Sequence, residues 1–158
     1  RDGLVAAGMP NVWSTGPGSV FDQAWWGQAG SAAAGAAGAY PLWNTSLAEL
    51  IGTAMLLIGI AALTDEDNLA PKSNIGPFMI GMLVLAIGLS LGGPSGYAIN
   101  PARDLGPRIF GLIVGTKDLF SDAYWIVVPV IMPLIGGIVG IFLYDLLIKP
   151  YLPKKEGA

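Results

Sequence analysis

The chain has 158 residues, of which 53% are hydrophobic and 12% are charged, and it contains no cysteine and no histidine. Soluble domains carry about 25% charged residues, so half that share together with long apolar runs indicates a bilayer environment. This composition excludes disulfides, thiolate metal sites and histidine-based catalysis or metal binding. The net charge of −3 comes without a basic patch, which argues against a nucleic-acid partner.

The N-terminal part, residues 3–43, consists mainly of small and aromatic residues. It contains turn-forming residues and lacks the apolar periodicity of an amphipathic helix. We expect an extended loop there, with at most one short helix in the Ala/Gly-rich stretch 29–39. The chain starts at Arg1, with no initiator methionine or signal peptide before it. We therefore expect a fragment, a processed product or one chain of a split protein.

The first apolar span runs from Leu47 to Thr64, and its start offers three capping residues, Asn44, Thr45 and Ser46. A charged loop over residues 65–74 separates it from a second span at 75–93. The last span, 123–147, is followed by Lys149, Lys154 and Lys155, which predicts a cytoplasmic C-terminus. The loop at 65–74 should lie on the same side of the membrane as this C-terminus. We expect all of these spans to be α-helical.

A broken segment separates the second and last spans. Gly92–Gly96 should end the second span, and a strand-like stretch should continue to Ile99. Pro101 suits the first position of a new helix, because its missing N–H would be unpaired there, and Asn100 then becomes the N-cap. This helix, at about 101–114, is too short to cross a bilayer and is predicted to be a half-helix.

Non-helical backbone at membrane depth is tolerated only inside protein or beside a water-filled cavity. The carbonyls before Asn100 cannot all be paired internally, and a helix N-terminus carries a partial positive charge. Arg103 adds a full charge, which must face carbonyls or a lumen because a guanidinium is costly in lipid. Arg103 could instead snorkel to an interface or pair with the adjacent Asp104. We favour the pore interpretation, because the re-entrant geometry and the carbonyl run occur together.

Glu49 is a charged residue within the first span, and two interpretations remain open. It could accept hydrogen bonds from N–H groups of the loop 92–100 and hold the loop carbonyls toward a lumen. It could instead be an interfacial residue near a helix start, where a carboxylate is favoured. We favour the anchor, because a buried carboxylate needs several donors.

Two further patterns have simple structural interpretations. Gly136 and Gly140 form a small-xxx-small surface, which predicts close helix packing. The acidic stretch Asp65–Asp67 is predicted to be a solvated turn.

Residues 96–108 read GYAINPARDLGPR and resemble the second Asn-Pro-Ala loop of the major intrinsic protein family. Three features resemble its aquaglyceroporin branch, the glycerol facilitators: Asp104 directly after Arg103, the pair Pro129-Val130, and Tyr40 before Pro41. The resemblance covers residues 40–147.

The resemblance implies an all-α membrane protein, the second half of an aquaporin-like inverted repeat with three transmembrane helices and one re-entrant half-helix. It divides the chain into an extracellular loop region at 1–43, a transmembrane half-channel at 44–149 and a cytoplasmic tail at 150–158. A closed pore would need the missing N-terminal half, in the same or another chain. A homotetramer in the plasma membrane, the inner membrane in bacteria, is further implied.

The resemblance also assigns roles to residues. The selectivity filter would contain Arg103, Tyr97 and Gly88. The pore-lining carbonyls would be those of Gly96, Tyr97 and Ala98. The Asn-Pro-Ala motif is Asn100, Pro101 and Ala102, and the structural anchors are Glu49 and Asp104. No catalytic residue, metal or cofactor is implied.

The expected function is passive transport of glycerol, other small uncharged polar solutes and water by a channel in contact with membrane lipid. An enzyme is not expected, because the sequence offers no nucleophile–base pair or metal cluster. Two alternatives stay open: a water, ammonia or metalloid-hydroxide channel on the same fold, and a non-conducting half-channel that serves as a structural subunit of a larger membrane assembly.

Overall fold

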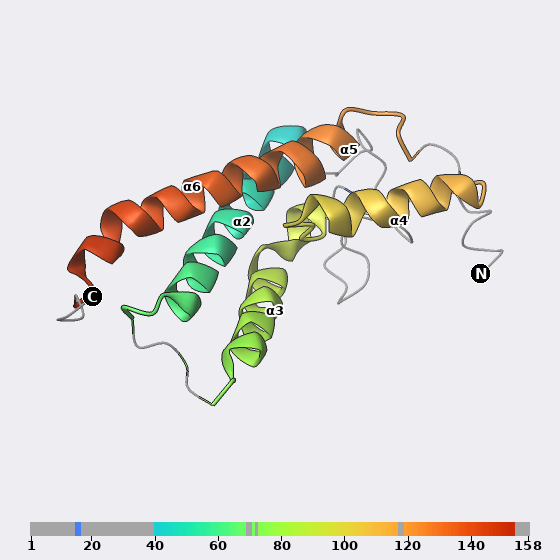
Figure 1. The fold of residues 1–158 in the computed structure, drawn as a ribbon. Helices are drawn as coiled ribbons and strands as arrows, with labels where there is room; N and C mark the ends of the chain where they lie inside the picture. The colour runs from blue at the N-terminus through green and yellow to red at the C-terminus, as the bar shows by residue number, and fades with distance from the viewer. Residues whose placement is uncertain (1–14, 17–39, 69–70, 72, 117–118, 154–158) are drawn as a thin grey trace.

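The computed structural model describes residues 15–16, 40–68, 71, 73–116 and 119–153. All regular elements in this part of the chain are helices (Figure 1), which confirms the predicted all-α membrane fold. The predictions for residues 3–39, including the short helix at 29–39, lie outside the described residues except at 15–16.

Three helical segments are long and apolar enough to cross a membrane: Leu42–Thr64, Gly76–Ser95 and Tyr124–Tyr151. The first two are α2 (Leu42–Thr64) and α3 (Gly76–Ser95). The third combines α5 (Tyr124–Ile126), η2 (Val127–Ile131), α6 (Met132–Leu147) and η3 (Lys149–Tyr151). Between α3 and α5 lies α4 (Pro101–Ile113), whose 13 residues are too few for a span that needs about 20. The predicted set of three spans and one short helix is confirmed.

The start of α2 differs from the prediction. The helix begins at Leu42 after Pro41, and no side chain caps it, so the expected cap at Asn44, Thr45 or Ser46 is wrong. Thr45 is buried inside the first turns, where its hydroxyl donates to the carbonyl of Leu42 at 2.9 Å. A threonine that bonds back to the preceding turn is compatible with a helix interior.

The last span is not α-helical throughout, which corrects a second expectation. Residues Val127–Ile131 form a π-helix, and the N–H of Met132 donates to the carbonyl of Val127, five residues earlier. Pro129 and Pro133 lack the N–H that an α-helix needs at their positions. The wider turn accommodates this loss within a continuous span.

The helices α2 and α6 pack closely along two glycines. A Cβ atom at Gly136 would collide with the carbonyl oxygen of Leu50, and one at Gly140 would collide with that of Ala54. Only glycine lets the two backbones approach this closely, so the predicted small-residue packing is confirmed. Figure 1 shows α6 running alongside α2, with α3 on the other side of α2.

The C-terminal end of α6 lies beside the loop that follows α2. The hydroxyl of Tyr144 donates to Oδ2 of Asp65 at 3.0 Å. The loop at 65–74 and the end of the last span therefore share one side, as predicted. Glu66 and Asp67 are exposed in a turn, as predicted, whereas Asp65 departs from that interpretation because of its contact with Tyr144.

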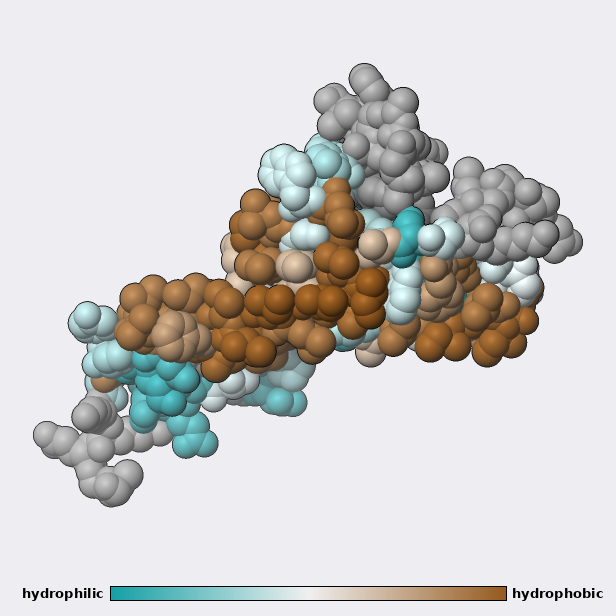
Figure 2. All heavy atoms as spheres, turned by 90° about the horizontal axis from the view of Figure 1, so that it is seen from above, coloured by the Kyte–Doolittle hydropathy of each residue, from teal (hydrophilic) through white to brown (hydrophobic). Residues whose placement is uncertain are grey.

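The outer surface is apolar over most of the face in Figure 2, with hydrophilic residues gathered near the C-terminal end. Large apolar side chains project outward from the spans; Phe78 is 63%, Ile138 72% and Phe142 62% exposed. Such a surface would favour aggregation in water and is suited to contact with lipid or with other spans.

Candidate functional site

The candidate site begins where α3 ends. The helix continues through Gly92 and Pro94 to Ser95, and Gly96 ends it in the left-handed region with φ 77°. The break therefore falls at Gly96, the last residue of the stretch predicted to end the span, and the expected strand-like backbone from Gly92 onward is wrong. Pro94 is tolerated because it lies in the last turn, where its missing N–H removes only one hydrogen bond.

The backbone after Gly96 is a left-handed loop rather than a strand. Tyr97 and Ile99 both have φ of 43°, a region that side chains, and β-branched ones above all, rarely occupy. Residues in such conformations cost on the order of 1–3 kcal/mol each and persist only where their surroundings hold them. The contacts of Glu49 and Ile99 supply that restraint.

The Glu49 carboxylate accepts three hydrogen bonds, one from the last residue of α3 and two from this loop. Its Oε1 accepts the hydroxyl of Ser95 at 2.6 Å and the N–H of Ala98 at 2.8 Å. Its Oε2 accepts the N–H of Ile99 at 2.6 Å. Glu49 lies inside α2 with 0% of its surface exposed, so the interpretation as an interfacial residue is overturned.

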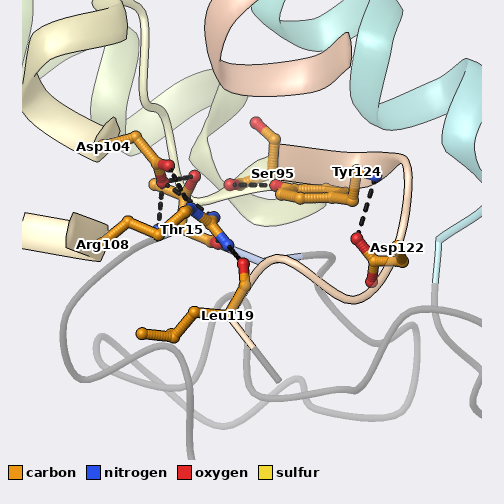
Figure 3. A network of polar contacts seen from close by, with 7 residues as sticks. All are labelled: Thr15, Ser95, Asp104, Arg108, Leu119, Asp122 and Tyr124. Atoms are coloured by element: carbon orange, nitrogen blue, oxygen red, sulfur yellow. Dashed lines mark hydrogen bonds and ion pairs between the residues drawn. The ribbon is translucent and has the colours of Figure 1, made fainter. Parts of the chain in front are cut away.

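Two further contacts hold the loop in place. The Ile99 side chain belongs to the buried cluster formed with Leu56 of α2 and Ile87 of α3. The Tyr124 hydroxyl donates to the carbonyl of Ser95 at 2.9 Å, as Figure 3 shows. The loop is therefore held by α2 and α3, and the end of α3 from which it starts is held by Tyr124.

The start of α4 has the predicted geometry. Asn100 is the N-cap, its Oδ1 accepts the N–H of Ala102 at 2.9 Å, and Pro101 follows in the first turn. The Asn100 side chain is exposed, as are those of Ala102 and Arg103. A helix N-terminus of this kind directs N–H groups and a partial positive charge, about half an elementary charge, toward whatever lies in front of it.

The structure brings Arg103, Tyr97 and Gly88 together. The guanidinium carbon of Arg103 lies 5.0 Å from the centre of the Tyr97 ring, within range of a cation–π interaction. The ring also lies on α3, because a Cβ at Gly88 would be 3.3 Å from its Cδ2 and Cε2 atoms. The space that Gly88 leaves is thus filled by Tyr97. Gly92 contacts the same ring and was missed by the sequence analysis.

Asp104 forms a buried ion pair with Arg108, which excludes the alternative that it pairs with Arg103. Nε of Arg108 lies 2.7 Å from Oδ1 of Asp104, and the two side chains are 5% and 0% exposed. Thr15 donates its N–H to Oδ2 of Asp104 at 2.6 Å and its hydroxyl to the same oxygen. Arg108 in turn donates to the carbonyls of Thr15 and Leu119 (Figure 3).

Arg108 is a residue whose role the sequence analysis missed. The available signal was its spacing, because an Asp and an Arg four residues apart lie on the same face of a helix.

The carbonyls of the loop complete the site. Among the described residues, no hydrogen bond ends on the carbonyl of Gly96, Tyr97 or Ala98. Buried carbonyls usually have partners, so acceptors left over beside an exposed cation suit a polar solute or water. No group of acidic residues in the described part of the chain could hold a metal ion.

Comparison with known proteins identifies the family to which the chain is related. The profile of the major intrinsic proteins matches residues 4–144. The chain is 42% identical to human aquaporin-10 over 113 residues, which are 70% of this chain and 38% of that protein. It is 40% identical to a propanediol uptake facilitator of Citrobacter freundii, covering 74% and 45% of the two chains. With a glycerol uptake facilitator of Shigella flexneri the identity is 40%, covering 66% and 39%.

The fold is similar to a solved structure as well. An aquaglyceroporin from Plasmodium falciparum superposes with a TM-score of 0.72 at 28% identity, covering 96% of this chain and 56% of that one. The chain thus spans less than half the length of the three relatives above. It is an integral membrane protein and belongs to the major intrinsic protein family.

Proposed function

We propose that this chain forms one half of a passive channel for glycerol, other small uncharged polar solutes and water. The observation that carries the proposal is the juxtaposition of Arg103, Tyr97 and the loop carbonyls at the end of a short helix. The names of two relatives, uptake facilitators for glycerol and for propanediol, support this class of solute. Transport would require no chemical step and no cofactor.

The channel would pass a solute by replacing the water around it with polar groups of the pore. Glycerol has hydroxyls along one edge and C–H groups along the other. The carbonyls of Gly96, Tyr97 and Ala98 would accept from its hydroxyls, and the guanidinium of Arg103 would donate to them. Tyr97, which is 40% exposed, would offer its ring as an apolar surface to the carbons. An ion would lose its hydration without equal compensation.

Proton exclusion would rest on the helix start and on Arg103. Asn100, at the N-terminus of α4, would orient a central water so that its protons point away from the middle of the pore. The positive end of α4 and the Arg103 charge oppose a proton relay in the same place.

Glu49 and Asp104 would act as structural anchors on the two sides of this site. Glu49 binds the loop N–H groups, which leaves the loop carbonyls available for solute. Asp104 pairs with Arg108 on the same helix, and Arg108 also donates to the carbonyls of Leu119 and Thr15, which ties α4 to segments outside it. Buried charges with several hydrogen-bond partners are suited to fixing geometry in this way.

The channel would also need partners and an orientation. Asn100, Arg103 and Tyr97 are exposed, so we propose that a second Asn-Pro-Ala half, in the same or another chain, covers them. The wide apolar surface supports assembly as a homotetramer surrounded by lipid. The lysines after the last span support a cytoplasmic C-terminus in the plasma membrane.

Stopped-flow light scattering tests the proposal on liposomes that contain the channel assembled from this chain and its complementary half. We expect glycerol permeability well above that of protein-free liposomes, with no added proton leak. Water flux without glycerol flux would favour the water-channel alternative. No flux of either solute would favour the structural half-channel.

A further inference from the structure

The Tyr97 ring packs against two glycines of α3, Gly88 and Gly92, which lie one helical turn apart. A Cβ at Gly88 would be 3.3 Å from one edge of the ring, at Cδ2 and Cε2. A Cβ at Gly92 would be 2.7 Å from the other edge, at Cδ1. Carbon atoms in favourable contact are about 3.5–4.0 Å apart, so a methyl group at Gly92 cannot be accommodated unless the ring moves.

The direction of that movement follows from the surroundings of the ring. Helix α3 lies behind it, and the left-handed backbone of Tyr97 is held by the hydrogen bonds of its neighbours Ala98 and Ile99 to Glu49. The remaining side is the exposed one, where the Arg103 guanidinium lies 5.0 Å from the ring centre. A displaced ring would therefore move toward Arg103.

We propose that Gly92 is a positioning residue that sets the width of the filter by seating the Tyr97 ring. This inference rests on the proposed channel function. A larger side chain at position 92 would push the ring, and with it the Arg103 guanidinium 5.0 Å from the ring centre, toward the exposed side along which a solute would pass. The permeability for solutes as large as three-carbon polyols would fall first, while water would still pass.

The test compares Gly92→Ala with Gly81→Ala in the assembled channel, by stopped-flow measurement of glycerol and water permeability. Gly81 lies in the same helix with no atom near its Cβ position, so it controls for the general effect of alanine in α3. We expect Gly92→Ala to lower glycerol permeability about tenfold, equivalent to about 1.4 kcal/mol in the barrier, with water permeability nearly unchanged. Gly81→Ala should behave like the wild type.

Repeating the Gly92→Ala substitution in channels that also carry a substitution at Tyr97 distinguishes ring displacement from misfolding. In a Tyr97→Ala channel there is no ring to displace, so adding Gly92→Ala should leave glycerol permeability unchanged. In a Tyr97→Phe channel, which keeps Cδ1, the full effect should remain. Equal glycerol permeability in Gly92→Ala and Gly81→Ala would overturn the inference, as would a loss that persists in the Tyr97→Ala background or affects water equally. A wild-type channel without glycerol flux would instead overturn the proposed function.

Discussion

The hydroxyl of Ser95 donates a 2.6 Å hydrogen bond to Oε1 of Glu49, which joins the last residue of α3 to the buried side of α2. The same carboxylate accepts the N–H groups of Ala98 and Ile99. One side chain therefore fixes both the end of a span and the strained loop that follows it. This arrangement makes Glu49 the most direct point at which to perturb the site.

The substitution Glu49→Gln should destabilise the protein and reduce flux. Glutamine keeps the size of the side chain but places an amide NH₂ where one of the three donors now bonds. A buried donor without an acceptor costs about 1–3 kcal/mol. Unfolding in mixed micelles titrated with SDS measures the loss. Glu66→Gln, on an exposed residue, is the matched control, and equal stabilities of the two variants would contradict the anchor role.

The substitution Asp104→Asn should destabilise the protein more strongly. It leaves the buried guanidinium of Arg108 without its counter-charge, and removing one partner of a buried pair costs about 3–5 kcal/mol. The exposed pair of Lys149 and Asp145, 3.7 Å apart, provides the control. Asp145→Asn should cost about 0–1 kcal/mol in the same SDS titration. If the two variants lose similar free energies of unfolding, the Asp104 network does not stabilise the half-helix.

The substitution Gly140→Ala should weaken the contact of α2 with α6. Its methyl group would meet the backbone carbonyl of Ala54, which cannot move aside as a side chain can. Forcing extra volume into a packed contact costs about 1–3 kcal/mol and more where backbone must shift. Gly137→Ala is the control in the same helix, because its Cβ would meet only the Leu57 side chain at 3.8 Å. In thermal unfolding measured in detergent, the midpoint temperature should fall for Gly140→Ala and stay at the wild-type value for Gly137→Ala.

Much of the fold followed from the sequence because local signals agreed. Long apolar runs with few charged residues marked the spans, and the dipeptide Asn100-Pro101 marked the start of the short helix. The pair Gly136 and Gly140 marked a contact between backbones. Each of these features depends on residues close together in the sequence, so it can be recognised from the sequence alone.

The rest depended on distant contacts or on backbone accommodation. The pairing of Asp104 with Arg108 is completed by carbonyls of Thr15 and Leu119, which no local pattern connects. Left-handed backbone at Tyr97 and Ile99 is unfavourable by itself and exists because Glu49 holds it. The π-helix at Val127–Ile131 resolves a proline conflict that could equally have produced a kink.

The most direct test of the central claim compares the solute profile of Arg103→Ala with that of the wild type in liposomes carrying the assembled channel, with Arg103→Lys as control. Stopped-flow measurement gives the permeabilities for glycerol, urea, water and protons. Without the guanidinium, discrimination between glycerol and urea should fall about tenfold, which corresponds to about 1.4 kcal/mol, protons should leak, and water should still pass. Lysine keeps the charge but not the planar donors, so it should exclude protons while discriminating solutes poorly. An unchanged solute profile in Arg103→Ala would contradict the claim that Arg103 lies at the constriction.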